Sequence, residues 1–228
     1  TGQRVISLLI LLAILLSTAM TTAVGQSIGV LSAMRAQQAV TIGGDRYATF
    51  VQMGEEQTKR LEQDRRLSFA GRYITLGTAE LNASLSLGLN EYQEDVAAVY
   101  PALAAVRAGR LPEEPMEIAL PEHVLRYLGA AGELGERIPL QFSKALRHGI
   151  ESKEVEVTAE FVLTGILEDN YLHYAGGAVT GIVGEGTAEM LLPERYLYYN
   201  VDIRTADKKT FQDTMDDLID TLSVHELD

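Results

Sequence analysis

The sequence has no cysteine among its 228 residues. This absence excludes disulfide bonds, thiolate catalysis and any zinc or iron–sulfur site that depends on cysteine ligands. It does not locate the protein, because a chain without disulfides can occupy any compartment. With 22% charged and 46% hydrophobic residues, the composition is otherwise that of a globular protein.

Motifs for nucleotide binding and for serine catalysis are also missing. No glycine-rich loop ends in Gly-Lys-Ser or Gly-Lys-Thr, and no Gly-x-Ser-x-Gly elbow occurs. Five glycines cluster late in the chain, but no basic residue lies between His173 and Arg195 to bind a phosphate. These glycines therefore predict turns: Gly176, Gly177, Gly181, Gly184 and Gly186.

Histidines and paired acids give no catalytic or metal-binding pattern. The four histidines are far apart in the sequence and form no His-x-x-x-His pair. Glu168-Asp169 follows a predicted strand and would fit half of a calcium site or two catalytic carboxylates, but acids at a strand end are more often solvated. We therefore predict no catalytic, cofactor-binding or metal-binding residue and no enzymatic activity. The histidines are His123, His148, His173 and His225.

The chain is acidic, with a formal net charge of −13. Among its first 34 residues only Arg4 is charged, so the acidic charge lies in the rest of the chain. An acidic domain repels phosphate backbones and anionic lipid headgroups. We therefore expect no nucleic-acid partner.

The N-terminal region carries one long uncharged run, from Val5 to Met34. About 20 helical residues cross the hydrocarbon core of a bilayer, so residues 5–24 are long enough to do so, and residues 1–26 are predicted as a transmembrane helix. Arg4 predicts a cytoplasmic N-terminus and an extracytoplasmic remainder in the cell membrane. The alternatives are a signal peptide cleaved at Ala23-Val24-Gly25, which exports the same domain, and a buried soluble helix.

Residues 27–44 are predicted as a stalk, and residues 45–228 as a mixed α+β domain, either single or in two subdomains. In the stalk, Ser27–Val40 has helical spacing and ends at Gly43-Gly44. Within the domain, helices are predicted over Tyr47–Leu67 and from Pro121 to a C-terminal cap at Gly129. The predicted strands are Arg72–Glu80, Ala83–Leu89, Glu117–Leu120, Arg137–Phe142, Glu154–Leu167 and Tyr196–Arg204.

The last predicted helix, Thr210–Leu222, is strongly amphipathic. Apolar residues recur at helical spacing along one face, and aspartates occupy the rest. We therefore expect the apolar face to pack against the sheet and the aspartates to face solvent. The apolar residues are Phe211, Met215, Leu218 and Leu222, and the aspartates are Asp213, Asp216, Asp217 and Asp220.

Three segments carry a resemblance to a known family. They are GRLPEEPMEIALPE from Gly109, Gly-Glu-Arg-Ile-Pro-Leu at 135–140, and Phe-Val-Leu-Thr-Gly-Ile at 161–166. Together they resemble the extracytoplasmic domain of MacB/FtsX-type ABC transporter permeases, which often shows G-R-x-P-x-x-x-x-E-I-x-L, then G-D-x-I-x-L, then V-x-G-I. Glu136 in place of Asp and Leu163-Thr164 before Gly165 are mild departures.

The resemblance implies a permease with four transmembrane helices and the large domain between the first two, of which this chain is the N-terminal part. It also implies a separate ABC ATPase, a second permease subunit in a dimer, and a role in export, lipoprotein release or peptide resistance. The stalk and the last helix would then carry motion, with Gly43-Gly44 as the hinge and with Val40 and Leu222 on the membrane-facing side. The alternative is a single-pass or secreted binding or sensor domain.

Overall fold

The computed structural model describes residues 15, 17, 18, 20, 32–41, 43–93, 96–148 and 151–222, which fall into two compact units divided after Ile42. In the first unit, residues 32–41 are helical, as predicted for the stalk. Most of the predicted span, residues 5–24, lies outside the described residues, although Leu15, Ser17, Thr18 and Met20 are helical. Within the described residues, no helix combines the length and the apolar character that crossing a membrane requires.

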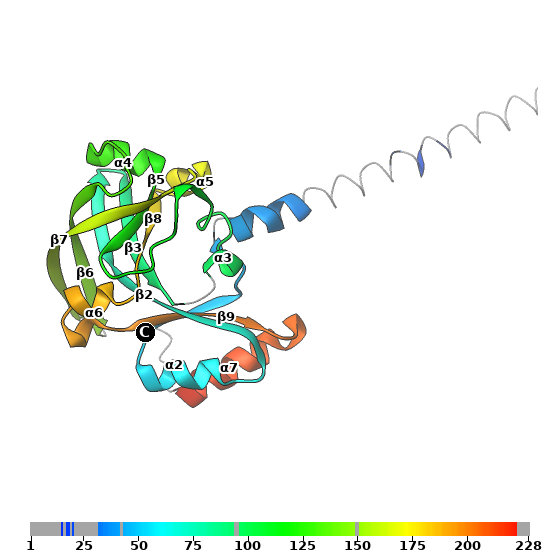
Figure 1. The fold of residues 1–228 in the computed structure, drawn as a ribbon. Coiled ribbons are helices and arrows are strands. Elements are labelled where there is room, and N and C mark those ends of the chain that lie inside the picture. Colours follow the sequence, from blue (N-terminus) through cyan, green and yellow to red (C-terminus); the bar gives the residue numbers. More distant parts are fainter. Residues whose placement is uncertain are drawn as a thin grey trace, which may run out of the picture. The chain divides into compact units, whose positions relative to one another are not determined.

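The second unit, Gly43–Asp228, is a mixed α+β domain, which confirms the predicted class (Figure 1). Its described residues form one nine-stranded sheet flanked by short helices. The strands are β1 (Ala48–Met53), β2 (Leu67–Asn82), β3 (Leu85–Tyr92), β4 (Val106–Gly109), β5 (Glu117–Pro121), β6 (Arg137–His148), β7 (Glu151–Leu167), β8 (Ala178–Val183) and β9 (Tyr199–Thr205). The helices are α2 (Glu55–Glu62), α3 (Val96–Val99), α4 (Glu122–Leu128), α5 (Tyr171–Ala175), α6 (Thr187–Leu191) and α7 (Phe211–Leu222).

Six of the nine described strands form a closed ring. The sheet runs β1-β9-β2-β3-β8-β5-β7-β4, and β6 pairs with both β7 and β2. The strands β2, β3, β8, β5, β7 and β6 therefore form a ring. Between β2 and β6 this ring is closed by the single residue pair Thr78↔Ser143. Of the three remaining strands, β4 pairs with the end of β7, and β1 and β9 extend the sheet away from the ring along the first half of β2.

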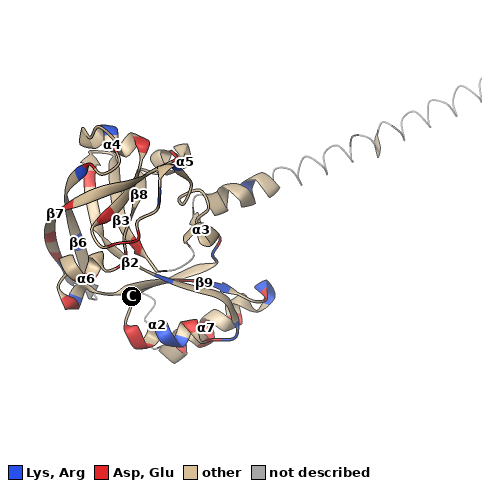
Figure 2. Cartoon of the chain, in the orientation of Figure 1, with Lys and Arg blue, Asp and Glu red and all other residues tan. Residues whose placement is uncertain are grey.

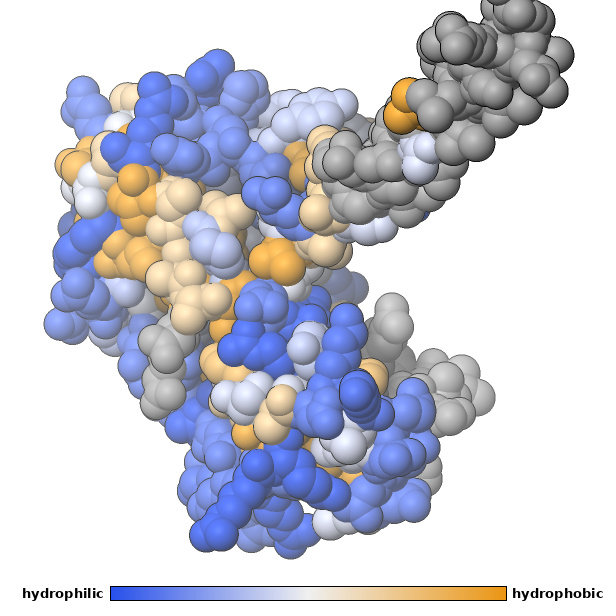
Figure 3. All heavy atoms as spheres, turned by 90° about the vertical axis from the view of Figure 1, so that its right-hand side faces the viewer, coloured by the Kyte–Doolittle hydropathy of each residue, from blue (hydrophilic) through white to orange (hydrophobic). Residues whose placement is uncertain are grey.

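Two main hydrophobic cores follow from this arrangement, besides a minor cluster of Leu103, Ala119, Leu167 and Ile182. The larger core fills the ring, where the alternating Leu85, Leu87 and Leu89 of β3 are all buried. The smaller core lies between β1, β9 and the helices α2 and α7, which lie together below β9 in Figure 1. On the face shown in Figure 3, the part of the domain with these two helices is largely hydrophilic, and hydrophobic surface gathers on the other part.

The last helix agrees with its prediction. Leu218 and Leu222 are buried in the smaller core, and Met215 packs against it. Phe211 is half-buried, and its ring contacts the ring of Tyr47. The four aspartates Asp213, Asp216, Asp217 and Asp220 are exposed.

The predicted helix Tyr47–Leu67 is wrong over most of its length. Its first part is strand β1, its last residue begins β2, and only Glu55–Glu62 is helical. The cause is tertiary pairing: Phe50 lies opposite Val201 of β9, about 150 positions along the chain, and local helical spacing cannot reveal such a partner.

The short helix α4 and the long hairpin β6–β7 refine two other predictions. Gly129 is the C-terminal cap of α4 with φ of 70°, as expected, whereas Pro121 is the N-terminal cap rather than the first helical residue. Both hairpin strands are longer than predicted, because β6 and β7 pair along the whole of β6, from Arg137↔Val162 to His148↔Glu151.

Candidate functional site

The three segments that carry the family resemblance meet in space. The Arg110 N–H donates to the Thr164 carbonyl at 2.9 Å, which joins the first segment to the third. The Gly135 N–H donates to the Leu163 carbonyl at 2.8 Å, and the Leu163 N–H donates to the Glu136 carbonyl at 2.9 Å. The second segment is therefore joined to the third as well.

Two glycines of these segments allow the close approach. A Cβ atom at Gly109 would lie 2.1 Å from the Thr164 carbonyl oxygen, and one at Gly165 would lie 2.2 Å from the Arg110 carbonyl oxygen. Both distances are well inside van der Waals contact. Gly109 also has φ of +78°, which L side chains rarely adopt. These positions therefore require glycine for packing.

Glu117 closes the proline-rich bend. Its carboxylate accepts two hydrogen bonds from the Arg110 guanidinium, at 2.8 and 2.7 Å, and two more from the backbone N–H groups of Glu113 and Glu114, at 2.9 and 3.1 Å. The hydrogen bonds from Arg110 are the main cause that lowers the pKa of Glu117 to about 2. Glu136 closes the next loop similarly, by accepting from Ala131 and Gly132 at 3.0 and 2.8 Å.

Of the two acids that follow β7, Asp169 links two helices. Asp169 accepts hydrogen bonds from the backbone N–H of His123 at 3.1 Å, from its Nδ1 at 3.1 Å and from the Tyr174 hydroxyl. Burial opposes ionisation of Asp169, but the bonds from Tyr174 and His123 outweigh it and lower the pKa of this carboxyl. Glu168 is exposed. The structure thus brings one carboxylate, one imidazole and one phenol together as a link between α4 and α5.

The other histidines form no metal site in the part of the chain that is described. No group of three or more His, Asp or Glu residues there is placed to hold a metal ion. His173 lies in α5, whereas the side chain of His148 and the whole of His225 are outside what the structure describes.

One glycine of the cluster, Gly186, contacts a buried carboxylate that the sequence did not indicate. Glu91, at the end of β3, is 1% exposed and accepts hydrogen bonds from the N–H groups of Gly186 and Ala188, at 3.0 and 2.6 Å. Burial raises the pKa of Glu91, and these two bonds oppose the rise. The helix terminus that would suit a phosphate is therefore occupied by the protein's own acid.

The segment Gly43–Thr49, called here the junction segment, leads from the first unit's sequence into the domain and is fixed by a second buried acid, Asp202 of β9. Asp202 is 2% exposed. Its carboxylate accepts hydrogen bonds from the Thr49 hydroxyl at 2.6 Å and from the Tyr100 hydroxyl, and Arg46 Nε lies 3.5 Å away. Burial raises the pKa of Asp202, and these three groups oppose the rise.

Backbone contacts hold the junction segment to both neighbouring elements. The Asp45 N–H donates to the Val99 carbonyl of α3 at 2.7 Å, and the Tyr47 N–H donates to the Ile203 carbonyl of β9 at 2.8 Å. Gly44 packs against Tyr100 so closely that a Cβ atom would lie 2.4 Å from its ring. From Gly44 onward, the junction segment is thus part of the folded domain.

The junction segment also contacts the last helix. The ring of Tyr47 meets that of Phe211, the first residue of α7, edge to face at 5.8 Å. The other end of α7 is held by Gln57 of α2, whose Nε2 donates to the Leu222 carbonyl at 3.0 Å. One end of α7 is therefore tied to the junction segment, and the other end is tied to α2, which follows the junction segment closely in sequence.

No protein-family model and no curated protein sequence matches the chain. Solved structures are similar to this chain. The names of two of them refer to a transporter and to a permease, and a third is a region of MacB, which belongs to the family that the sequence resembles. The extracellular domain of the noncanonic ABC-type transporter YknZ from Gram-positive bacteria matches with 14% identity and a TM-score of 0.49, over 78% of this chain and 87% of that one.

The other two matches are similar in extent. The periplasmic region of MacB from Actinobacillus actinomycetemcomitans matches with 12% identity and a TM-score of 0.45, over 76% of this chain and 75% of that one. A domain of a putative permease protein from Porphyromonas gingivalis matches with 12% identity and a TM-score of 0.42, over 79% and 74%.

Proposed function

We propose that this chain is the N-terminal part of an ABC transporter permease subunit and is not itself an enzyme. Residues 5–24 anchor it in the cell membrane, and Gly43–Asp228 lies on the extracytoplasmic side. Its partners are a separate ABC ATPase and a second permease subunit. The sequence resemblance supports this proposal, because its three segments form one hydrogen-bonded unit rather than scattered matches.

The observation that carries a mechanical role is the anchoring of the junction segment by Asp202. A displacement of the preceding stalk can move the domain only if the connection is stiff, because a flexible linker absorbs it. Thr49 and Arg46 bind the carboxylate from the junction segment, and Tyr100 binds it from the position directly after α3. A pull on the chain at Gly43 is therefore passed directly to β9 and α3. Within this proposal the transporter serves export, lipoprotein release or peptide resistance.

A labelling experiment tests the topology. Because the chain has no cysteine, a single Glu133→Cys substitution in an exposed loop gives one reactive thiol. A membrane-impermeant maleimide should label it in intact cells, whereas a Gln3→Cys control should react only after lysis. Protection of Glu133→Cys in intact cells would overturn the proposed location.

A second experiment separates the permease from the alternative, a single-pass or secreted binding domain. The full gene should encode three further hydrophobic spans, and the full protein should co-purify with an ABC ATPase. A gene without further spans, or label on position 133 in a secreted product, would favour the binding domain.

A further inference from the structure

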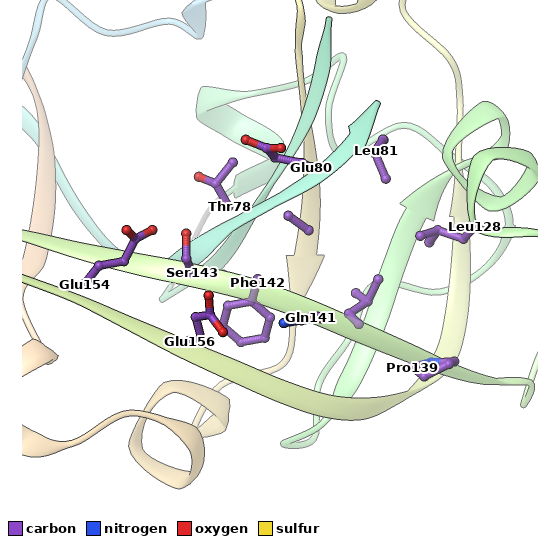
Figure 4. Close-up of a pocket in the computed structure, with 12 residues that line it drawn as sticks. Thr78, Glu80, Leu81, Leu128, Pro139, Gln141, Phe142, Ser143, Glu154 and Glu156 are labelled. Carbon is purple, nitrogen blue, oxygen red and sulfur yellow. The ribbon is translucent and has the colours of Figure 1, made fainter. Parts of the chain in front are cut away.

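The ring of strands contains an open seam between β2 and β6. A cavity of about 540 Å³ lies there, between Thr78–Leu81 of β2 and Pro139–Ser143 of β6 (Figure 4). Its volume is within the range of known ligand sites, about 300–1,000 Å³.

The seam exists because the two strands diverge from one point. They pair only at Thr78↔Ser143. At this closed end, Lys144 Nζ donates to the Thr75 carbonyl, and a Cβ atom at Gly77 would lie 2.4 Å from the Ser143 carbonyl oxygen. The strands are therefore tight against each other at one end of the cavity and apart along the rest of it.

Along the cavity each strand has a partner on its other edge only. Ala79 and Glu80 of β2 pair with Leu87 and Ser86 of β3. In the same way β6 pairs with β7 over this stretch, for example Leu140 with Ala159. Among the described pairings, Thr78↔Ser143 is the only one between the two strand edges that face the cavity. Such unpaired edges are templates for another strand.

The side chains around the seam divide into two groups. Three exposed carboxylates line it, none has an ion pair with a described residue, and no Lys or Arg is among the lining residues. In Figure 4 these carboxylates, Glu80, Glu154 and Glu156, lie toward one end, and Leu81, Leu128 and Pro139 lie toward the other. Figure 2 shows that Asp and Glu residues recur along β7, which carries two of the three.

We propose that the seam binds an extended segment of a partner polypeptide that adds as a strand between β2 and β6, with Lys or Arg side chains beside the glutamates and apolar side chains beside the leucines. Strand addition supplies main-chain hydrogen bonds, and the flanking side chains supply specificity. The three carboxylates of the seam favour a partner segment that carries Lys or Arg over a second copy of this acidic chain. This binding is independent of the permease role, since the chain alone contains the whole seam.

The length of the occupant follows from strand geometry. Four residues of β2, Thr78–Leu81, line the cavity, and an extended chain rises about 3.3 Å per residue. The seam therefore accommodates about four to five residues of an extended peptide, and the ends of a longer peptide extend beyond it.

The test measures the fluorescence anisotropy of a labelled, end-blocked peptide, Lys-Thr-Lys-Thr-Leu-Thr-Leu, with the full chain in detergent micelles. We expect saturable binding that weakens with added salt. The double variant Glu154→Gln/Glu156→Gln should bind roughly two- to thirtyfold more weakly, as expected for two lost exposed charge pairs. The matched control Glu133→Gln/Glu194→Gln removes two exposed glutamates that do not line the seam and should bind like the parent chain.

Two further peptides separate strand addition from charge attraction alone. Versions methylated at alternate backbone nitrogens keep the side chains but lose main-chain donors, and they should bind at least tenfold more weakly. Equal binding of the methylated peptides, equal binding by the Glu154→Gln/Glu156→Gln variant, or absence of binding to the parent chain would overturn the proposal. Displacement of the peptide by unlabelled full chain would instead identify a second copy as the occupant, which also contradicts it.

Discussion

Glu117 shows how much one side chain can contribute to a bend made of two prolines and a glycine. Its folded-state pKa of about 2 lies below the ordinary value of 4.5, because Arg110 and two backbone N–H groups stabilise the carboxylate. A carboxyl with a depressed pKa stabilises the fold above its unfolded pKa, and this stabilisation is lost as the pH falls through the folded pKa. Glu117 therefore contributes fully above about pH 4.5 and not below about pH 2.

The first prediction uses this window. Glu117→Gln should lower the free energy of unfolding by about 1–3 kcal/mol at pH 7, because hydrogen bonds to a charged group are replaced by weaker neutral ones. Denaturant titration at several pH values should show the difference from the parent chain shrinking between pH 4.5 and pH 2. A difference that stays constant over this range would show that the carboxylate charge is not the cause.

The second prediction concerns the hydroxyl–carboxylate pair of Tyr100 and Asp202. Burial raises the pKa of the Tyr100 phenol, so this phenol stays protonated and donates to the carboxylate. In a double-mutant cycle of Tyr100→Phe and Asp202→Asn, the coupling free energy should be about 0.5–3 kcal/mol. The same cycle with Tyr127→Phe, an exposed tyrosine of α4, is the control and should give none.

The residues of these networks differ in how visible they are in the sequence. Gly109, Arg110 and Glu117 stand in one short segment, so a local pattern pointed to them. Asp202 and Glu91 did not stand out, because an acid in the middle or at the end of a strand normally faces solvent. Their burial depends on donors about 100 or 150 positions away, and no local pattern carries that information.

At the scale of elements, α7 provides the third prediction. Leu218 is 3% exposed in the smaller core, so Leu218→Ala should lower the free energy of unfolding by about 2–5 kcal/mol. Asp216→Ala on the same helix removes only an exposed hydrogen bond from Gln212 and should change stability by less than about 0.5 kcal/mol. Thermal or denaturant unfolding measures both, and equal small effects would mean that the helix is not packed against the sheet.

Elements were predictable where their pattern was local. The alternation in β3, the cap at Gly129 and the stripe of α7 each lie within a few residues, and all three agree with the structure. The segment of β1 shows the opposite case. Phe50, Met53 and Leu61 all face the smaller core, so they fit one helical face in the sequence although they belong to a strand and a separate helix.

At the scale of the whole molecule, the fourth prediction tests the proposed stiffness of the connection. Ten Gly-Ser residues inserted after Val40 in the full permease should reduce transport or resistance, whereas binding of the ATPase subunit should survive. An insertion of two Glu-Ala-Ala-Ala-Lys repeats has the same length but is largely helical, and it should preserve more function. Equal function of both insertions would defeat the idea that the stalk transmits motion.

The pairing of β1 with β9 has a consequence for how the domain is made. β1 is among the first strands to leave the ribosome, but the strand it pairs with, β9, ends at Thr205. The smaller core likewise needs α7, which ends at Leu222. This half of the domain therefore cannot form until the residues up to Leu222 have been synthesised. Its folding is a late step, limited by closure of a loop of about 150 residues, and chaperones would have their longest access to Phe50 and Met53 during that interval.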